Sequence, residues 1–280
     1  MILLWGLATD PPLRAVRDRL DGREVVFVDH AAVARTRVRL DGEAFTLEVD
    51  GDAVSLDAVT AAYLRPYDAR LYGSDVPRAA AGTHHLVYEW AESTTAVVVN
   101  RPSAEASNHS KLLQARAIRA CGLATPESLV TNERDRILDF RARHASVIYK
   151  SLSSVRSVVA ELDPETLPAG AMGPAFVQQR IRGTNVRVHV VGDRTFACAV
   201  ETEGVDYRYA PARLYAVALP AEVAERCVAL ASHLSLLLAG IDLIEGEDGE
   251  WYCLEANPSP AFSAFDRDGA IAGAVAELLS

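Results

Sequence analysis

Short apolar runs alternate with amphipathic stretches along the first hundred residues, and this alternation is typical of a small α/β unit. The apolar runs predict strands, and stretches in which apolar positions recur every three or four residues predict helices. We expect strands at residues 2–5, 24–29, 45–49, 59–65 and 96–100, and helices at residues 11–20 and 83–94. The run at 45–49 closes with Asp50-Gly51-Asp52, which indicates a hairpin turn.

The same pattern divides the rest of the chain into two further regions. In the first we expect helices at 109–121 and 133–144 and strands at 127–131 and 147–150. In the second we expect strands at 176–181, 186–191 and 195–200, a long helix at 220–238, and a hairpin of 239–244 with 251–257. The fold class is therefore α/β. The N-terminal order of elements resembles a Rossmann-like half domain, but the loop at residues 6–12 has no GxGxxG pattern, so we expect no dinucleotide site there.

Composition narrows the class of protein. Half of the 280 residues are hydrophobic and 24% are charged, as in ordinary soluble proteins. The formal net charge of −10 argues against general nucleic-acid binding. No apolar run reaches the roughly 20 residues of a membrane-spanning helix, and residues 1–7 lack the basic flank of a signal peptide. The four scattered cysteines form no CxxC pair, so we expect reduced thiols in a cytoplasmic protein with no membrane partner.

The C-terminal hairpin carries the candidate metal ligands. Alternate side chains of a strand share a face, so Glu255 and Asn257 point the same way. Asp242 lies in the preceding apolar run, and residues 247–249 (Glu-Asp-Gly) make the turn between the two runs. Two carboxylates and a carboxamide are hard oxygen ligands that leave room for water and phosphate oxygens, which suits a nucleotide-bound Mg²⁺. The alternative is an edge hairpin with solvated acids.

Two lysines are candidate phosphate contacts. Lys111 lies near the start of a predicted helix, and Lys150 ends an apolar strand. Burial of an ammonium group is costly unless an anion meets it, so phosphate is a natural partner for Lys150. The serine-rich residues 151–154 follow it and could offer backbone N–H groups to phosphate. Exposed lysines at helix and strand ends are common, which is the alternative for either lysine alone.

These features together resemble the ATP-grasp superfamily over residues 100–280. The matching motifs are a lysine-bearing helix, a lysine-ended strand with a phosphate loop, a hinge segment and an Asp…Glu-x-Asn metal set. The likeness extends to the branch of ribosomal-protein glutamate ligases and peptide-maturing ligases, on residues 100–103, 108–111, 126–132 and 255–262. The resemblance implies a Rossmann-like pre-ATP-grasp domain at residues 1–100, a central ATP-grasp lobe at 101–177 and a C-terminal lobe with the Mg²⁺ site at 178–280.

The resemblance also implies a role for each motif residue, with ATP between the two lobes and its adenine near the hinge. The implied ATP-binding residues are Lys111, Lys150, Ser151, Ser153, Ser154, Gln178, Gln179, Arg180 and Ile181. The implied ligands of Mg²⁺ are Asp242, Glu255 and Asn257. The implied catalytic residues are Lys150 and Arg187, the latter facing the transferred phosphoryl group. An exposed strand arginine is the alternative for Arg187.

The implied activity is ATP-dependent ligation of a carboxylate to an amine or an alcohol through an acyl phosphate. The expected substrate is a peptide or an amino-acid-like molecule. Catalysis of this kind rests on positioning and charge neutralisation rather than on a protein nucleophile. Two alternatives stay open: an ATP-grasp small-molecule kinase and a non-catalytic nucleotide-binding scaffold. A homo-oligomer, a dimer or a tetramer, is a further expectation by analogy with the branch.

Candidate substrate contacts lie in the N-terminal and C-terminal regions. Residues 63–66 (Tyr-Leu-Arg-Pro) are similar to a substrate-side arginine motif of the maturases, and polar groups interrupt the strand pattern at residues 205–209. The residues concerned are Arg65, Tyr207, Arg208 and Arg213, with a surface loop as the alternative. Gln179 and Asn185 depart from the family pattern, which usually has acids there, and the loop after Lys150 lacks glycine.

Overall fold

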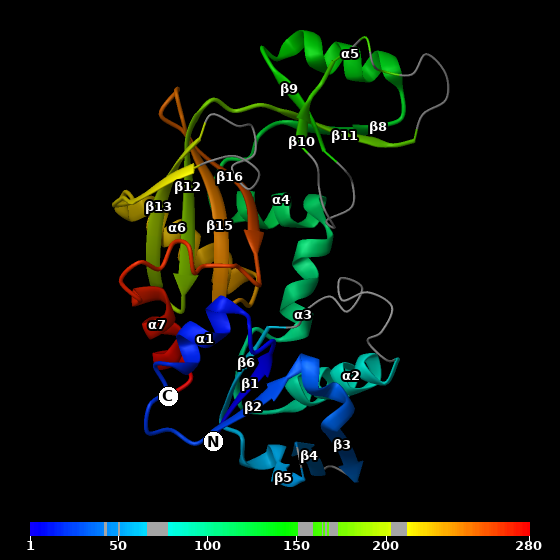
Figure 1. The fold of residues 1–280 in the computed structure, drawn as a ribbon. Helices are drawn as coiled ribbons and strands as arrows, with labels where there is room; N and C mark the ends of the chain where they lie inside the picture. The colour runs from blue at the N-terminus through cyan, green and yellow to red at the C-terminus, as the bar shows by residue number, and fades with distance from the viewer. Residues whose placement is uncertain are drawn as a thin grey trace.

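The computed structural model describes residues 1–41, 44–49, 51–65, 78–150, 159–163, 165, 167, 173–202 and 212–280. These residues form three stacked parts (Figure 1): an N-terminal unit in blue and cyan at the bottom, a five-stranded sheet in the middle, and a small lobe carrying α5 (Arg134–Arg143) at the top. The α/β class expected from the sequence is confirmed. In the described part of the chain, no helix is long and apolar enough to cross a membrane.

The N-terminal unit is built on a parallel sheet with the strand order β2-β1-β6-β7. Its strands are β1 (Ile2–Gly6), β2 (Val25–Asp29), β6 (Ala61–Leu64) and β7 (Val97–Val99), and its helices are α1 (Pro11–Arg17) and α2 (Arg78–Ser93). Strands β1 and β6 are buried along their whole length, because the middle strands of a parallel sheet are covered on both faces. Each of these elements lies close to its predicted bounds.

An antiparallel three-stranded sheet adjoins this unit, formed by β3 (Thr36–Asp41), β4 (Ala44–Val49) and β5 (Asp52–Ser55). The predicted hairpin is confirmed, since β4 pairs with β5 and Gly51 between them has a φ of +99°. The apolar pattern missed β3, because arginines alternate with its apolar residues and Leu40 is exposed. Short 3-10 helices at η1 (His30–Arg35), η2 (Leu56–Ala58) and η4 (Ala106–His109) connect larger elements.

The upper lobe is an antiparallel sheet with one face covered by α5. Its strand order is β10-β9-β11-β8, with β8 (Ser128–Thr131), β9 (Val147–Lys150), β10 (Val159–Glu161) and β11 (Ala175–Gln179). Alternation along β11 turns Ala175 and Val177 toward Ile137 and Phe140 of α5. The other face of the upper sheet is turned toward the middle sheet, across the space between the two sheets.

The middle sheet is antiparallel, with the order β14-β13-β12-β15-β16. Its strands are β12 (Gly183–Val191), β13 (Arg194–Thr202), β14 (Ala212–Ala216), β15 (Leu238–Gly246) and β16 (Trp251–Asn257). One face packs on α4 (Lys111–Ala120) and α6 (Ala221–His233) through a core that includes Ile118, Leu230 and Ile241. Helix α3 (Pro102–Glu105) precedes α4. The predicted hairpin at the C-terminal end of the sheet is confirmed as β15 and β16.

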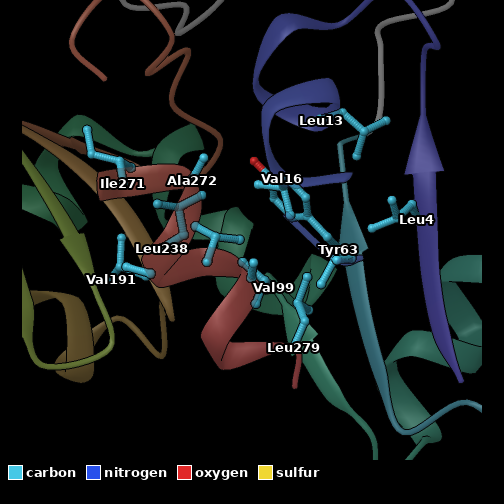
Figure 2. Close-up of a cluster of buried hydrophobic side chains, with 14 of the residues drawn as sticks. Leu4, Leu13, Val16, Tyr63, Val99, Val191, Leu238, Ile271, Ala272 and Leu279 are labelled. Carbon is cyan, nitrogen blue, oxygen red and sulfur yellow. The ribbon is translucent and has the colours of Figure 1, made fainter. Parts of the chain in front are cut away.

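A second core joins the N-terminal unit to the middle sheet. In Figure 2, α7 (Ala270–Leu278) lies between the ends of β12 and β15 on one side and α1 and β1 on the other. Leu4 and Val16 of the N-terminal unit, Leu238 of β15 and Ile271 of α7 belong to the same buried cluster. Burial of apolar surface stabilises this junction by about 25 cal/mol per Å². Because these residues belong to one cluster, the N-terminal unit and the middle sheet share one interior.

The prediction of a long helix at residues 220–238 is wrong at its C-terminal end. Helix α6 ends at His233, and Leu238 already begins β15. Ser235 takes a left-handed conformation with φ +58°, and the Leu236 N–H donates to the carbonyl of Ala231 at 2.8 Å. This left-handed ending usually carries glycine. Because serine stands at this position instead of glycine, the sequence did not indicate that the helix ends here.

Candidate functional site

A cavity of about 550 Å³ lies between the upper sheet and the middle sheet, lined by residues of α4, β9, β11, β12, β15 and β16. Its volume falls in the range of small-molecule sites. The predicted nucleotide, metal and phosphoryl contacts that the structure describes all line it. They are Lys111, Lys150, Gln178, Gln179, Arg180, Ile181, Arg187, Asp242, Glu255 and Asn257. Ser151, Ser153 and Ser154 lie outside the described residues.

The acidic wall of the cavity comes from the β15–β16 hairpin. Asp242 and Glu255 stand directly opposite each other, and Asn257 stands opposite Gly240. A β-bulge shifts the register between Asp242 and Leu243, so that residue 254 is the extra residue of β16. Bulges next to sites re-aim side chains, and here the bulge separates the regular part of the hairpin from the three oxygen-bearing residues.

The donor set fits a hard divalent cation. Two facing carboxylates and a carboxamide offer oxygen atoms, the ligands that Mg²⁺ prefers. Among the described residues no group of three His, Cys, Asp or Glu side chains could hold a metal. Mg²⁺ binds through one or two carboxylates and fills its other positions with water and phosphate oxygens, so a closed protein cage is not needed. The Asn257 Oδ1 also accepts a hydrogen bond from the Ser259 N–H at 2.9 Å, which fixes the carboxamide.

Arg187 lies against this wall. Its Nη1 donates to Asp242 Oδ1 at 2.7 Å, and the guanidinium is only 7% exposed. Strand pairing explains the contact, because Arg187 of β12 stands opposite Asp242 of β15. Gly240 makes room for it: a Cβ there would lie 2.7 Å from Arg187 Cζ and 2.7 Å from Pro260 Cβ. A buried ion pair is costly to form, and one placed in a cavity is a common mark of a functional site.

Lys111 is the first residue of α4. Ser110 caps this helix by accepting from the Leu113 N–H at 3.2 Å. A cation at the positive end of a helix is unfavourable unless an anion binds there. Partial burial lowers the pKa of Lys111, and the charge of Glu255 works in the opposite direction. Lys111 and Glu255 both line the cavity.

Lys150 reaches the cavity from the upper sheet. It ends β9, where it stands opposite Phe176 of β11 on one side and Val159 of β10 on the other. The prediction of a buried strand holds for only part of β9. Val147 and Ile148 are buried, but Tyr149 is 42% exposed. Alternation explains this, because Ile148 and Lys150 face the cavity while Tyr149 points away from it.

The segment predicted to be the hinge, residues 178–181, begins with a polar side chain beside an apolar wall of the cavity. Phe176 and Gln178 of β11 face the cavity beside Ile148. Gln178 is 7% exposed, and its Oε1 has no hydrogen-bond partner among the described residues. A buried acceptor left unpaired costs about 1–3 kcal/mol, so this oxygen is suited to an N–H donor of a planar ligand resting on the apolar wall.

The neighbouring hinge residues have structural partners. The Gln179 Oε1 accepts from the Glu127 N–H at 3.3 Å, and its own N–H donates to the Glu127 carbonyl at 2.9 Å. Arg180 lies 3.6 Å from a carboxylate oxygen of Glu161. Gln179, where the family usually has an acid, therefore fastens the start of β8 in this chain.

The two substrate-side candidates that the structure describes, Arg65 and Arg213, do not line the cavity. Arg65 is partly buried and donates to Asp10 at 2.5 Å, to the Pro260 carbonyl at 3.0 Å and to Ser259 Oγ at 3.5 Å. Arg213 is exposed on β14, at the opposite edge of the middle sheet from β16. Tyr207 and Arg208 lie outside the described residues.

Two buried amide side chains to which the sequence analysis gave no role hold strand β16 and the residue after it. Gln114 bonds both backbone groups of Ala256, and Asn100 donates to the Pro258 carbonyl at 2.6 Å. Asn100 also bonds Leu238, donating to its carbonyl at 2.7 Å. The available signal for Gln114 was its position three residues after Lys111, on the same helix face.

Comparisons with known proteins agree with this architecture. The ATP-grasp ligase PsnB in complex with a minimal precursor matches with a TM-score of 0.82 and 27% identity, covering 99% of this chain and 97% of that chain. A RiPP-associated ATP-grasp ligase from Chryseobacterium gregarium, in complex with ADP and a leader and core peptide, matches with a TM-score of 0.81 and 19% identity, covering 99% and 96%. No family model matches the chain.

One curated protein also matches, a probable alpha-L-glutamate ligase from Rhodopirellula baltica. It is 27% identical over 241 residues, which are 78% of this chain and 59% of that protein. The chain thus spans about three fifths of the length of this relative.

Two sheets face each other across a cavity of about 550 Å³, and the chain is similar over nearly its whole length to ATP-grasp ligases, whose fold it shares. Its solved neighbours include ATP-grasp ligases determined with precursor peptides, and its curated relative is a glutamate ligase. The resemblance stated from the sequence is therefore confirmed.

Proposed function

We propose that the protein is an ATP-dependent ligase that joins a carboxylate to an amine or an alcohol through an acyl phosphate. One observation carries the proposal: a single cavity gathers Lys111, Lys150, Arg187 and the Asp242–Glu255 pair from five separate elements. Three cations beside two carboxylates suit a polyphosphate bound with a divalent cation. A binding-only scaffold has less need of all five groups.

ATP and Mg²⁺ are the proposed ligands. The ligase PsnB, 25% identical to this chain with a TM-score of 0.79, was determined with Mg, ADP and a minimal precursor. In this chain Asp242, Glu255 and Asn257 would hold Mg²⁺, which when bound neutralises phosphate charge. The unpaired Oε1 of Gln178 supports an adenine site at the hinge, because adenine carries an N–H₂ donor.

The residues of the chain act on the phosphates by position and charge. The substrate carboxylate oxygen bonds to the γ-phosphorus as the bond to the β,γ-bridging oxygen breaks and ADP leaves. Lys150 and Arg187 would neutralise the charge that spreads over the transferred group. The amine or hydroxyl then bonds to the acyl carbon, phosphate leaves, and one proton is released. Lys111, at a helix N-terminus, would hold the phosphates of the nucleotide in place.

A peptide or an amino-acid-like molecule is the proposed substrate. Two of the similar structures are complexes with peptides: PsnB with a minimal precursor, and the Chryseobacterium gregarium ligase with a leader and core peptide. We include Arg65, Tyr207, Arg208 and Arg213 as candidate substrate contacts. Arg65 has the firmest support, since its bonds to Ser259 and Pro260 place it directly beyond Asn257.

The proposal also covers the division of the chain. The parallel β2-β1-β6-β7 sheet supports a Rossmann-like domain at residues 1–100, and the two sheets that flank the cavity support ATP-grasp lobes at 101–177 and 178–280. A cytoplasmic location is supported by the four cysteines, which are all free thiols. A homo-oligomer stays part of the proposal by analogy alone.

The test is ADP release from Mg·ATP in the presence of pooled amino acids and peptides, with hydroxylamine added. Hydroxylamine traps an acyl phosphate as a hydroxamate, so ADP together with a substrate hydroxamate supports the ligase and identifies the acid. ADP with a stable phosphorylated product would favour a kinase. Mg·ATP binding without ADP release from any mixture would favour the non-catalytic scaffold, and absence of nucleotide binding would contradict the proposal.

A further inference from the structure

Gln114 makes a two-bond clamp on the strand that carries Glu255 and Asn257. Its Nε2 donates to the Ala256 carbonyl at 2.7 Å, and its Oε1 accepts from the Ala256 N–H at 3.2 Å. Gln114 is 5% exposed and Ala256 is fully buried. Ala256 lies between the two oxygen-bearing residues, so the clamp grips the backbone at the centre of the acidic wall.

The clamp replaces a missing neighbouring strand. Strand β16 is the edge of the middle sheet and pairs only with β15 among the described strands. In an antiparallel ladder, alternate residues turn their backbone groups away from the partner strand. The outward groups of β16 are satisfied by other partners: the Cys253 N–H donates to the Ala124 carbonyl at 2.8 Å, and Ala256 is taken by Gln114.

The β-bulge makes this grip important. The register shifts between Asp242 and Leu243, so pairing of Trp251 to Cys253 does not by itself determine the register of residues 255–257. A slip of one residue would exchange the two faces of a strand. Glu255 and Asn257 would then leave the cavity, and Ala256 would enter it. Because both bonds of Gln114 go to Ala256, a slip would break both of them.

The clamp also links the acidic wall to Lys111. Gln114 lies one turn after Lys111, so both project from the same side of α4. We propose that Gln114 is a positioning residue that keeps Glu255 and Asn257 turned into the cavity at a constant distance from Lys111. The inference rests on the proposed function, because it assigns Gln114 a part in forming the Mg²⁺ site.

The test compares ADP binding with and without Mg²⁺ by isothermal titration calorimetry, for the wild-type protein and Gln114→Met. Methionine has a similar length, keeps the helix and cannot make either bond. We expect ADP affinity in EDTA to be preserved and the enhancement by Mg²⁺ to fall about tenfold or more, as for loss of supporting groups around a metal. Arg116→Met on the exposed face of α4 is the matched control and should keep the full enhancement.

Each outcome has one meaning. Full Mg²⁺ enhancement in Gln114→Met would overturn the positioning role. An equal loss of ADP affinity in EDTA and in Mg²⁺ would also overturn it, since it indicates general damage to the cavity. Wild-type protein that binds ADP with no response to Mg²⁺ would refute the metal site of the proposed function itself. If Gln114→Met does not accumulate as folded protein, Gln114→Glu replaces it, because glutamate keeps the acceptor for the Ala256 N–H and loses the donor. The results for Gln114→Glu are then interpreted as those described for Gln114→Met.

Discussion

Adding a single methyl group at Gly240 should separate Arg187 from Asp242. The Cβ of Gly240→Ala would lie 2.7 Å from Arg187 Cζ and 2.7 Å from Pro260 Cβ. Carbon atoms in contact are normally about 3.5–4.0 Å apart, so a neighbour must move by about 1 Å. Pro260 is held through its carbonyl by Arg65 at 3.0 Å. The Arg187 guanidinium, at the end of a longer and more flexible side chain, is therefore the group that yields.

The size of the effect follows from that displacement. A shift of about 1 Å would lengthen the Arg187–Asp242 contact from 2.7 Å to about 3.7 Å, beyond the range of an N–H···O hydrogen bond. Loss of one preorganised donor at a developing charge costs about 10²–10³ in kcat. We expect Gly240→Ala to lower kcat by about tenfold to 10³-fold, because the cation is displaced rather than removed. Overpacking of this kind also costs about 1–3 kcal/mol of stability.

The assay is ADP release under saturating Mg·ATP, with the thermal unfolding midpoint measured on the same samples. Gly82→Ala is the matched control: Gly82 is exposed in α2, and a Cβ there meets nothing within 4 Å. Alanine in a helix is favoured over glycine by about 0.5–1 kcal/mol, so this variant should keep its activity and be as stable as the wild-type protein or slightly more stable. Unchanged kcat in Gly240→Ala would refute the placement of Arg187 in catalysis.

The remaining predictions concern the metal ligands, a buried amide and pH. Glu255→Ala and Asn257→Ala should abolish turnover while ADP still binds in EDTA; product formed at the wild-type rate by both would refute the metal assignment. Asn100→Ala leaves buried groups at the start of β15 and after β16 unpaired, at about 1–3 kcal/mol for each, so its denaturant midpoint should fall clearly. An unchanged midpoint would contradict the stabilising role of the Asn100 hydrogen bonds. Burial lowers the pKa of His30 and of His189 to about 3. Between pH 6.5 and about 3, these two histidines therefore bind protons in the unfolded chain but not in the folded protein. The free energy of unfolding should therefore decline as pH falls from 6.5 toward 3, by at most about 1.4 kcal/mol per pH unit for each histidine. His189→Phe should reduce that slope in urea titrations, and an equally steep slope would count against the burial of a neutral imidazole.

The residues proposed to bind metal and phosphate could be selected from the sequence because each carries a local signal, and those that the structure describes line one cavity. Alternation places Glu255 and Asn257 on one face whatever the rest of the fold does. Lys150 stood out because an apolar run rarely ends in a cation, whose burial is costly. The apolar runs likewise marked the strands of the parallel sheet, since buried strands need continuous apolar sequence.

Other features could not be predicted, because their signal is weak or shared with other structures. The end of α6 at His233 depends on a serine in a left-handed conformation, a position that glycine usually marks. Strand β3 carries alternating arginines and an exposed Leu40, so it lacked an apolar face to reveal it. The substrate-side role of Arg65 rested on a short motif, and the structure shows this side chain bonded to Asp10 and to the loop after β16.

The sequence by itself determined which residues could form the site: the periodicity of apolar positions set the elements, and the placement of acids and lysines on them set the chemistry. Only the tertiary structure decided how these residues meet. Arg187 contacts Asp242 because strands far apart in sequence pair side by side, and Gly240 matters because a guanidinium occupies the space above it. Gln114 holds Ala256 across 142 residues of sequence separation. Such contacts depend on the distance between groups in space, which local patterns of one chain do not specify.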